Sequence, residues 1–386
     1  MENTCIDYMH SILLGVVKTF FKYWFDGDIR KPYSLKKYMQ VIDTRLLKLR
    51  PPNYVSNVPR SIYGWNKWRA HEYLSFLLYY SLPVFYKIVP HNIYVNLTKL
   101  VIFIEKILYV SIEREALLYI QNIILDFSKE LSSLYDKSIM LSGVHELLHL
   151  VECTIQFGHL NSINCFPFEE VNRKFLNFIH GKDLIGEEFI KIFSIIQSLC
   201  TSTHNDNIDN QLQQFIEKNY LIGTSNNKSL HFNSRITLFD ANTVYKNDEN
   251  QKLFGEYNAV FNDDTNEIKV YSKINIYGYT FNTKYNWAKH DDSCYFFNDE
   301  MGIINWIIKR DDEIFLISKK IVVIHNPFYC PAFPKIKSSL SVGHITDELI
   351  VHKLMNRTNT IEKICLFSFS KNECFTSTYN SGHLFV

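Results

Sequence analysis

The periodicity of the sequence changes near residue 219, and this change constrains the fold most. Before it, apolar residues recur three or four positions apart, as at Ile12, Val16 and Phe20, which is the spacing of one face of an α-helix. After it, short segments rich in β-branched and aromatic residues alternate with turn residues. The pattern predicts an α+β protein, with a mostly helical N-terminal part followed by a small antiparallel, barrel-like β domain.

The same patterns predict individual elements. Helices are expected over 8–25, 34–49, 70–90, 92–109, 112–136, 143–156, 168–180, 185–200 and 207–218. After a Ser- and Asn-rich linker, strands are expected over 255–262, 267–271, 274–281, 302–309, 313–323 and 363–369. Helical spacing predicts that one set of side chains in the helical part is buried: Trp68, Phe76, Leu78, Ile104, Leu108, Leu118 and Ile123.

Composition narrows the class of protein. The net charge of +1 argues against a dedicated DNA-coating protein but is compatible with a local basic groove. The 8 cysteines include no CxxC pair, which favours free thiols in a reducing compartment. We expect neither a secretory leader nor a membrane-spanning segment. An intracellular protein, nuclear or cytoplasmic, with no membrane partner is therefore expected.

Two motifs carry residue types that bind metals. Asp7-Tyr8-Met9-His10 opens a helix, where the carboxylate either favours the helix dipole or binds a metal ion with His10 orienting it. His145-Glu146-Leu147-Leu148-His149 is a literal HExxH, whose two histidines share one helical face and can hold zinc. Glu169, further along, is a plausible third ligand. The apolar helix around the motif equally fits histidines that are satisfied in the core.

Two further segments allow both a structural and a functional interpretation. Phe166-Pro167-Phe168-Glu169 has proline and an acidic residue where a helix begins, which is ordinary at an N-terminus. Between Trp65 and Glu72, aromatic residues alternate with Lys67 and Arg69. Such a segment either grips a phosphate backbone and stacks on bases or starts a helix packed by two tryptophans.

Taken in order, these segments resemble the animal-type CACTA (EnSpm-like) DNA transposase family over about residues 5–200. The similar blocks are Asp7-Tyr-Met-His-Ser-Ile-Leu-Leu-Gly15, Leu49-Arg-Pro-Pro52, Pro59-Arg-Ser-Ile62, Trp68-Arg-Ala-His-Glu72, His145-Glu-Leu-Leu-His-Leu150, Gly158-His-Leu160 and Phe166-Pro-Phe-Glu169. The resemblance implies an RNase H-like core remnant (1–33), a helical insertion (34–160), return helices of the core (161–222) and a β-rich C-terminal domain (223–386).

The resemblance also implies a chemistry. Two aspartates and one glutamate of the family hold Mg²⁺ or Mn²⁺ ions that activate water, and then a 3′-hydroxyl, for attack on DNA phosphate. Asp7 corresponds to the second aspartate, with His10 beside it, and Glu169 or alternatively Glu72 corresponds to the glutamate. Residues 1–6 cannot supply the first aspartate and its strands. We therefore expect a truncated or domesticated transposase-derived protein, inactive alone, with no stably bound metal ion.

The expected partners follow from the same interpretation. They are DNA, bound weakly and without sequence preference at Lys67 and Arg69, or a protein bound through the β domain. Apolar surface near 1–20 and 160–170 is expected to be exposed and to favour self-association. The alternative function is a zinc-dependent peptidase built on His145, His149 and Glu169. If the chain is transposase-derived, we expect no stoichiometric zinc, and histidines that are packed or hydrogen-bonded rather than exposed at a cleft.

Overall fold

The fold comes from a computed structural model that describes residues 5–55, 58–108, 114–176, 185–202, 229–231, 236–284, 290–354, 361–370 and 373–377. The chain divides into two compact units, one formed by Met1–Ile163 with Lys228–Val386 and the other by Asn164–Asn227. Each is described by itself. The expected helix over 207–218 and most of the expected linker lie outside the described residues. The expected domain boundaries after residues 33, 160 and 222 stay predictions.

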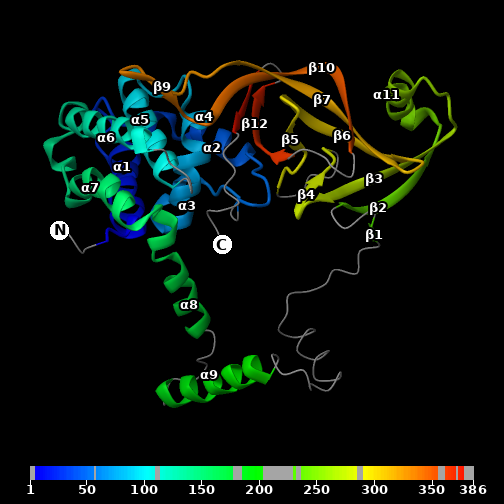
Figure 1. Cartoon of the computed structure of the whole chain (residues 1–386). Helices are drawn as coiled ribbons and strands as arrows, with labels where there is room; N and C mark the ends of the chain where they lie inside the picture. The colour runs from blue at the N-terminus through cyan, green and yellow to red at the C-terminus, as the bar shows by residue number, and fades with distance from the viewer. Residues whose placement is uncertain are drawn as a thin grey trace. The chain divides into compact units, whose positions relative to one another are not determined.

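The first unit begins with the expected helices (Figure 1). A continuous helix comprises η1 (Met9–Val17), α1 (Lys18–Phe21) and η2 (Lys22–Asp26), and both η segments are π-helical. The rest are η3 (Lys36–Tyr38), α2 (Met39–Lys48), η4 (Ile62–Lys67), α3 (Ala70–Ser75), η5 (Phe76–Tyr80), α4 (Ser81–Phe85), α5 (His91–Ile107), α6 (Arg114–Leu134), η6 (Lys137–Ile139), α7 (Ser142–Phe157) and η7 (Leu160–Ile163). These bounds confirm the helices expected between residues 8 and 157.

Aromatic rings fill the core of the helical part. Phe21 is fully buried, and its ring centroid lies 4.9 Å from that of Phe76 and 5.4 Å from that of Trp68. Six of the seven side chains expected to be buried are at most 6% exposed, but the prediction for Leu118 is wrong, because this side chain is 70% exposed. Its neighbour Leu117 belongs to the buried stripe of α6, and one residue along an α-helix turns a side chain by about 100°.

The start of the chain is packed more closely than expected. The prediction of exposed apolar surface over residues 1–20 is wrong for η1, because Ile12 and Leu13 are fully buried. The helix contacts α3 and α7. Gly143 of α7 permits the close approach, since a Cβ there would lie 2.7 Å from the Ser11 carbonyl oxygen. Among residues 5–33, all of which are described, the structure contains helices and turns but no β-strand.

The β part of the first unit is an antiparallel sheet that curls into a half-barrel (Figure 1). Its main path runs β1-β2-β3-β6-β7-β10-β13-β12, with β4 paired to β3, β5 to β6 and β11 to β5. The strands of this sheet are β1 (Ser229–His231), β2 (Ile236–Tyr245), β3 (Glu267–Ile276), β4 (Tyr279–Asn282), β5 (Cys294–Phe297), β6 (Glu300–Arg310), β7 (Glu313–His325), β10 (Leu340–Leu354), β11 (Glu362–Lys363), β12 (Cys365–Ser370) and β13 (Glu373–Ser377). A separate hairpin pairs β8 (Tyr329–Cys330) with β9 (Phe333–Lys337).

Two expected strands differ from the structure. The segment expected as a strand over 255–262 belongs to helix α11 (Gln251–Phe261), which follows η8 (Asp248–Asn250). Its buried residues Leu253, Phe254 and Tyr257 have helical spacing and pack against the sheet. The segment 274–281 is two strands, because Tyr277 and Gly278 adopt positive φ angles of 52° and 88° and turn the chain between β3 and β4.

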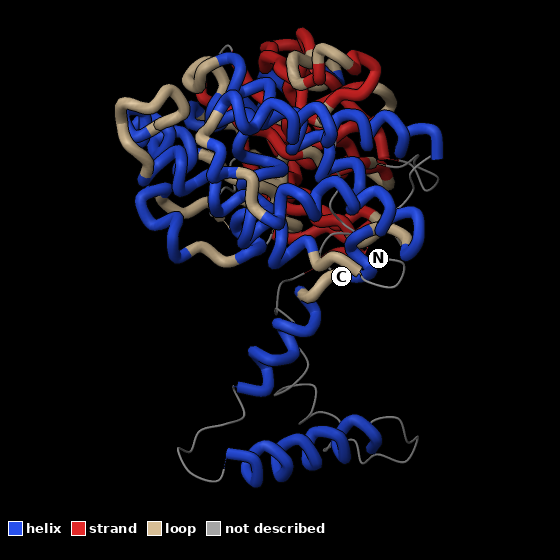
Figure 2. Tube along the Cα trace, turned by 90° about the vertical axis from the view of Figure 1, so that its left-hand side faces the viewer, coloured by secondary structure: helices blue, strands red, loops and turns tan. Residues whose placement is uncertain are grey.

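Buried polar contacts join the helical and β parts. In Figure 2, where helices are blue and strands red, the helices of this unit lie in front of the sheet. The Glu105 carboxylate on α5 accepts hydrogen bonds from the Ser338 hydroxyl at 2.9 Å and the Ser339 amide at 3.0 Å. The loop after α2 supplies Asn53, whose side-chain oxygen lies 3.0 Å from Lys363 Nζ. Both parts therefore belong to one compact unit.

The second unit contains α8 (Phe166–Leu176) and α9 (Ile185–Ser202), which agree with the helices expected there. Glu169 lies in the first turn of α8, where its charge complements the helix dipole. Apolar surface was expected near 160–170, and here Phe168 is 69% exposed whereas Leu160 of the first unit is fully buried.

Candidate functional site

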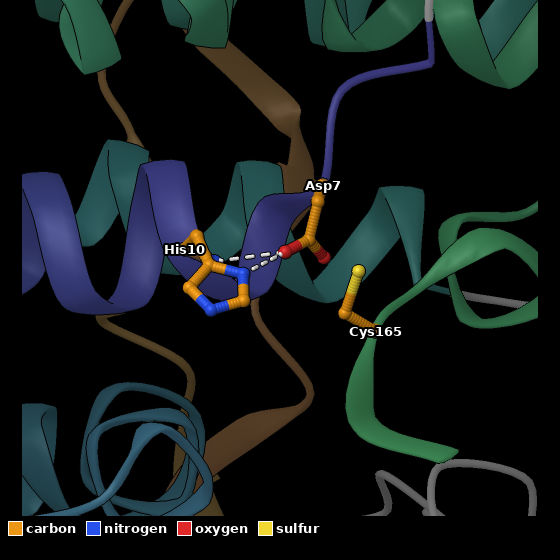
Figure 3. A group of neighbouring side chains, drawn as sticks. All are labelled: Asp7, His10 and Cys165. Atoms are coloured by element: carbon orange, nitrogen blue, oxygen red, sulfur yellow. Dashed lines mark hydrogen bonds and ion pairs between the residues drawn. The ribbon is translucent and has the colours of Figure 1, made fainter. Parts of the chain in front are cut away.

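Asp7 acts as a cap for η1. Its Oδ1 accepts a hydrogen bond from the Met9 amide at 3.2 Å, and its Oδ2 accepts one from the His10 amide at 3.2 Å. The His10 ring pairs with the same carboxylate through Nδ1, as Figure 3 shows. The carboxylate therefore satisfies amides at the helix start that lack intrahelical partners. The contacts with the amides agree with the interpretation in which Asp7 favours the helix dipole. The contact with His10 is the one expected if His10 orients the carboxylate.

The two candidate glutamates lie in different surroundings. Glu72 accepts a hydrogen bond from the Arg69 amide at 2.8 Å and forms an ion pair with Arg60, whose Nε lies 2.5 Å from Oε1. Among the described residues of the first unit, it does not join Asp7 and His10 in a group whose ligand atoms lie within 4.8 Å. Glu72 thus has a structural role at the start of α3. Glu169, like the Cys165 drawn in Figure 3, belongs to the second unit, so its pairing with Asp7 stays a prediction.

The basic and aromatic segment divides into a buried and an exposed half. Trp65 and Trp68 are 7% and 6% exposed, and both rings pack against Phe21. The tryptophans therefore pack the helix start, and they are not platforms on which bases can stack. Lys67 and Arg69 are exposed, and their contact with phosphate stays a prediction.

The HExxH histidines lie on the solvent side of α7. Their Nε2 atoms are 3.3 Å apart, and the ring planes make an angle of 78°. His145 is exposed and the His149 side chain is 34% exposed. The prediction that they are hydrogen-bonded is confirmed, but the prediction that they are not exposed at a cleft is wrong, because His149 lines a groove. They face outward because the buried stripe of α7, which includes Leu147 and Leu150, uses the opposite positions.

This groove lies between α6 and α7 and has a volume of about 630 Å³. Its lining is mostly apolar: Leu117, Leu118, Gln121, Leu148, His149, Val151, Glu152 and Ile155. The groove was not predicted from the sequence. A signal was present, since Leu118 and Ile155 lie next to the buried stripes of their helices, but only the packing angle of the two helices decides that such side chains line a groove.

Comparisons with known proteins assign no family. No family model, no curated protein and no solved structure matches this chain. Of the helices that the structure describes, none combines the length and apolar character needed to cross a bilayer.

Proposed function

We propose that this chain is a transposase-derived protein of the CACTA type whose residues serve as a binding scaffold and do not cut DNA. The observation that carries the proposal is the use of the Asp7 carboxylate. Both of its oxygens accept hydrogen bonds from amides of η1, and one of them also pairs with His10. The proposal includes an RNase H-like origin for the first helices of the chain.

Loss of cleavage follows from what a two-metal reaction needs. Several carboxylates must hold both ions and offset their mutual repulsion. Asp7 would have to bind the ions while both of its oxygens also accept hydrogen bonds from η1, and Glu72 would have to release Arg60. A displacement of about 1 Å in a catalytic group can cost about 100-fold in rate, so carboxylates committed to other partners support very little turnover.

The retained activity in this proposal is weak binding to DNA. Lys67, the last residue of η4, and Arg69, which directly precedes α3, are both exposed and can contact phosphates. Because the net charge of the chain is +1, few phosphates are neutralised. Binding is therefore salt-sensitive and independent of sequence.

A cleavage assay tests the first half of the proposal. Purified chain is incubated with DNA ends and Mn²⁺, in parallel with the variants Asp7→Ala and Glu169→Ala. The expected result is no cleaved or joined product from any of the three. Cleavage by the unmodified chain that disappears in both variants would refute the proposal.

A binding assay tests the second half. Affinity for duplex DNA is measured against salt concentration, and each of Lys67→Ala and Arg69→Ala is expected to reduce the salt slope by about 0.9 per lost phosphate contact. Lys129→Ala, which removes an exposed lysine on α6, is the matched control. Nanomolar affinity for one defined sequence at physiological salt would contradict the proposal.

A further inference from the structure

We propose that His145 and His149 form a binding site for a divalent transition-metal ion such as Zn²⁺, held by their Nε2 atoms on the outer face of α7. Imidazole nitrogen is a preferred ligand of zinc, copper and nickel. The site uses neither Asp7 nor the residues proposed to bind DNA, and it replaces the expectation of no stoichiometric zinc that the transposase resemblance carried for this motif.

The distance between the two nitrogens fits one shared ion. Two ligands at about 2.0–2.1 Å from a tetrahedral zinc ion lie about 3.3–3.4 Å apart. The Nε2 atoms of His145 and His149 are 3.3 Å apart. The spacing therefore fits the edge of a metal tetrahedron as well as it fits a long hydrogen bond between the two rings.

The backbone that carries the two rings is held in place. Leu147 and Leu150, on the opposite side of α7, are fully buried. Gln121 of α6 donates a hydrogen bond to the Leu148 carbonyl oxygen at 3.1 Å, which ties the middle of the motif to the neighbouring helix. The free energy of metal binding therefore need not offset the cost of ordering this helix.

Glu152 supports the ligand geometry from behind. Its Oε2 lies 3.6 Å from His149 Nδ1. A carboxylate beside the second nitrogen of a metal-binding histidine fixes the tautomer and raises the basicity of the ligating nitrogen. At 3.6 Å the contact between Glu152 and His149 is electrostatic and is longer than a hydrogen bond. The charge of Glu152 also stabilises a nearby cation.

The site is open and its binding is correspondingly exchangeable. Among the described residues of the first unit, no third His, Cys, Asp or Glu has a ligand atom within 4.8 Å of both Nε2 atoms. Water therefore completes the coordination shell, as in sites that keep positions for an external ligand. Hard ions such as Mg²⁺ are disfavoured, since they select oxygen ligands. The inference assigns a metal site and no peptidase reaction.

Titration of the full chain with ZnCl₂ by isothermal calorimetry tests the proposal. One zinc ion per chain is expected, and His145→Ala and His149→Ala should each weaken its binding by about tenfold or more. His91→Ala removes an exposed histidine of α5 and is the matched control, with unchanged affinity expected. Co²⁺ provides a second readout, because a tetrahedral site gives intense visible absorption that both variants should lose.

Two results would overturn the inference. One is zinc affinity within about twofold of the unmodified chain in both histidine variants. The other is zinc binding that is lost in His10→Ala instead, which would move the site to the N-terminal pair. Far-UV circular dichroism of each variant shows whether α7 is retained. His149→Gln, which keeps a polar side chain, provides a second test if the alanine variant fails to fold.

Discussion

Replacing Asp292 by alanine is expected to destabilise the fold by breaking a buried ion pair. Lys363 Nζ lies 2.8 Å from Asp292 Oδ1 and 3.0 Å from Asn53 Oδ1. The side chains of Lys363 and Asp292 are 1% and 5% exposed. Asp292 also accepts a hydrogen bond from the Asn53 amide at 2.9 Å. The alanine variant removes the carboxylate that accepts a hydrogen bond from the buried ammonium group, and it also removes the acceptor of the Asn53 N–H.

The magnitude follows from this burial. Removing one partner of a buried ion pair costs about 3–5 kcal/mol, because the remaining charge stays desolvated. A domain is stabilised by about 5–15 kcal/mol in total, so Asp292→Ala is expected to remove a large fraction of the free energy of unfolding. The exposed pair Lys246–Asp264, whose side chains are 43% and 73% exposed, is expected to contribute about 0–1 kcal/mol. Asp264→Ala is therefore the matched control.

Urea unfolding, followed by circular dichroism and tryptophan fluorescence, measures both variants in the full chain. The double variant Asp292→Leu with Lys363→Met should recover most of the loss, since apolar residues of similar volume often replace a buried pair at little cost. A loss of less than about 1 kcal/mol in the free energy of unfolding of Asp292→Ala would refute this prediction. Asp292→Leu and Lys363→Met are also measured singly. If their two losses simply add up to the loss of the double variant, the pairing is contradicted, because paired residues must show coupling.

Three further predictions concern the core. Burial raises the pKa of Glu105, so the folded chain binds the proton of this carboxyl group more tightly than the unfolded chain does. The stability that this protonation contributes is fully present below about pH 4.3, and it is lost as pH rises through the raised pKa of the folded state. Glu105→Gln should then reduce the decline of Tm with rising pH, and an unchanged slope would contradict this. Gly143→Ala should destabilise the fold by about 1–3 kcal/mol, since its Cβ would lie 2.7 Å from the Ser11 carbonyl oxygen. Gly255→Ala in α11 is the control, because its Cβ would meet nothing within 4 Å, and it should stabilise the fold by about 0.5–1 kcal/mol. Equal effects of the two changes in thermal unfolding would refute the packing argument. Phe21→Ala should cost about 3–5 kcal/mol in urea unfolding, because the ring is fully buried among other aromatic rings, and a loss below about 1 kcal/mol would contradict its central place.

The sequence by itself determined what depends on neighbours along the chain. Apolar spacing predicted the helices between residues 8 and 157, because a helical face needs only positions three and four apart. The same local geometry placed His145 and His149 on one face of α7. Asp7 at a helix start was predicted from the motif for a similar reason, since a helix end leaves amides unpaired within a few residues.

Tertiary structure decided whatever depends on distant residues. The buried ion pair joins residues 71 positions apart, and Lys363 reaches Asn53 across 310 positions. Leu118 is exposed and 251–261 is helical because the surfaces available for burial are set by α7 and by the sheet, which local periodicity does not encode.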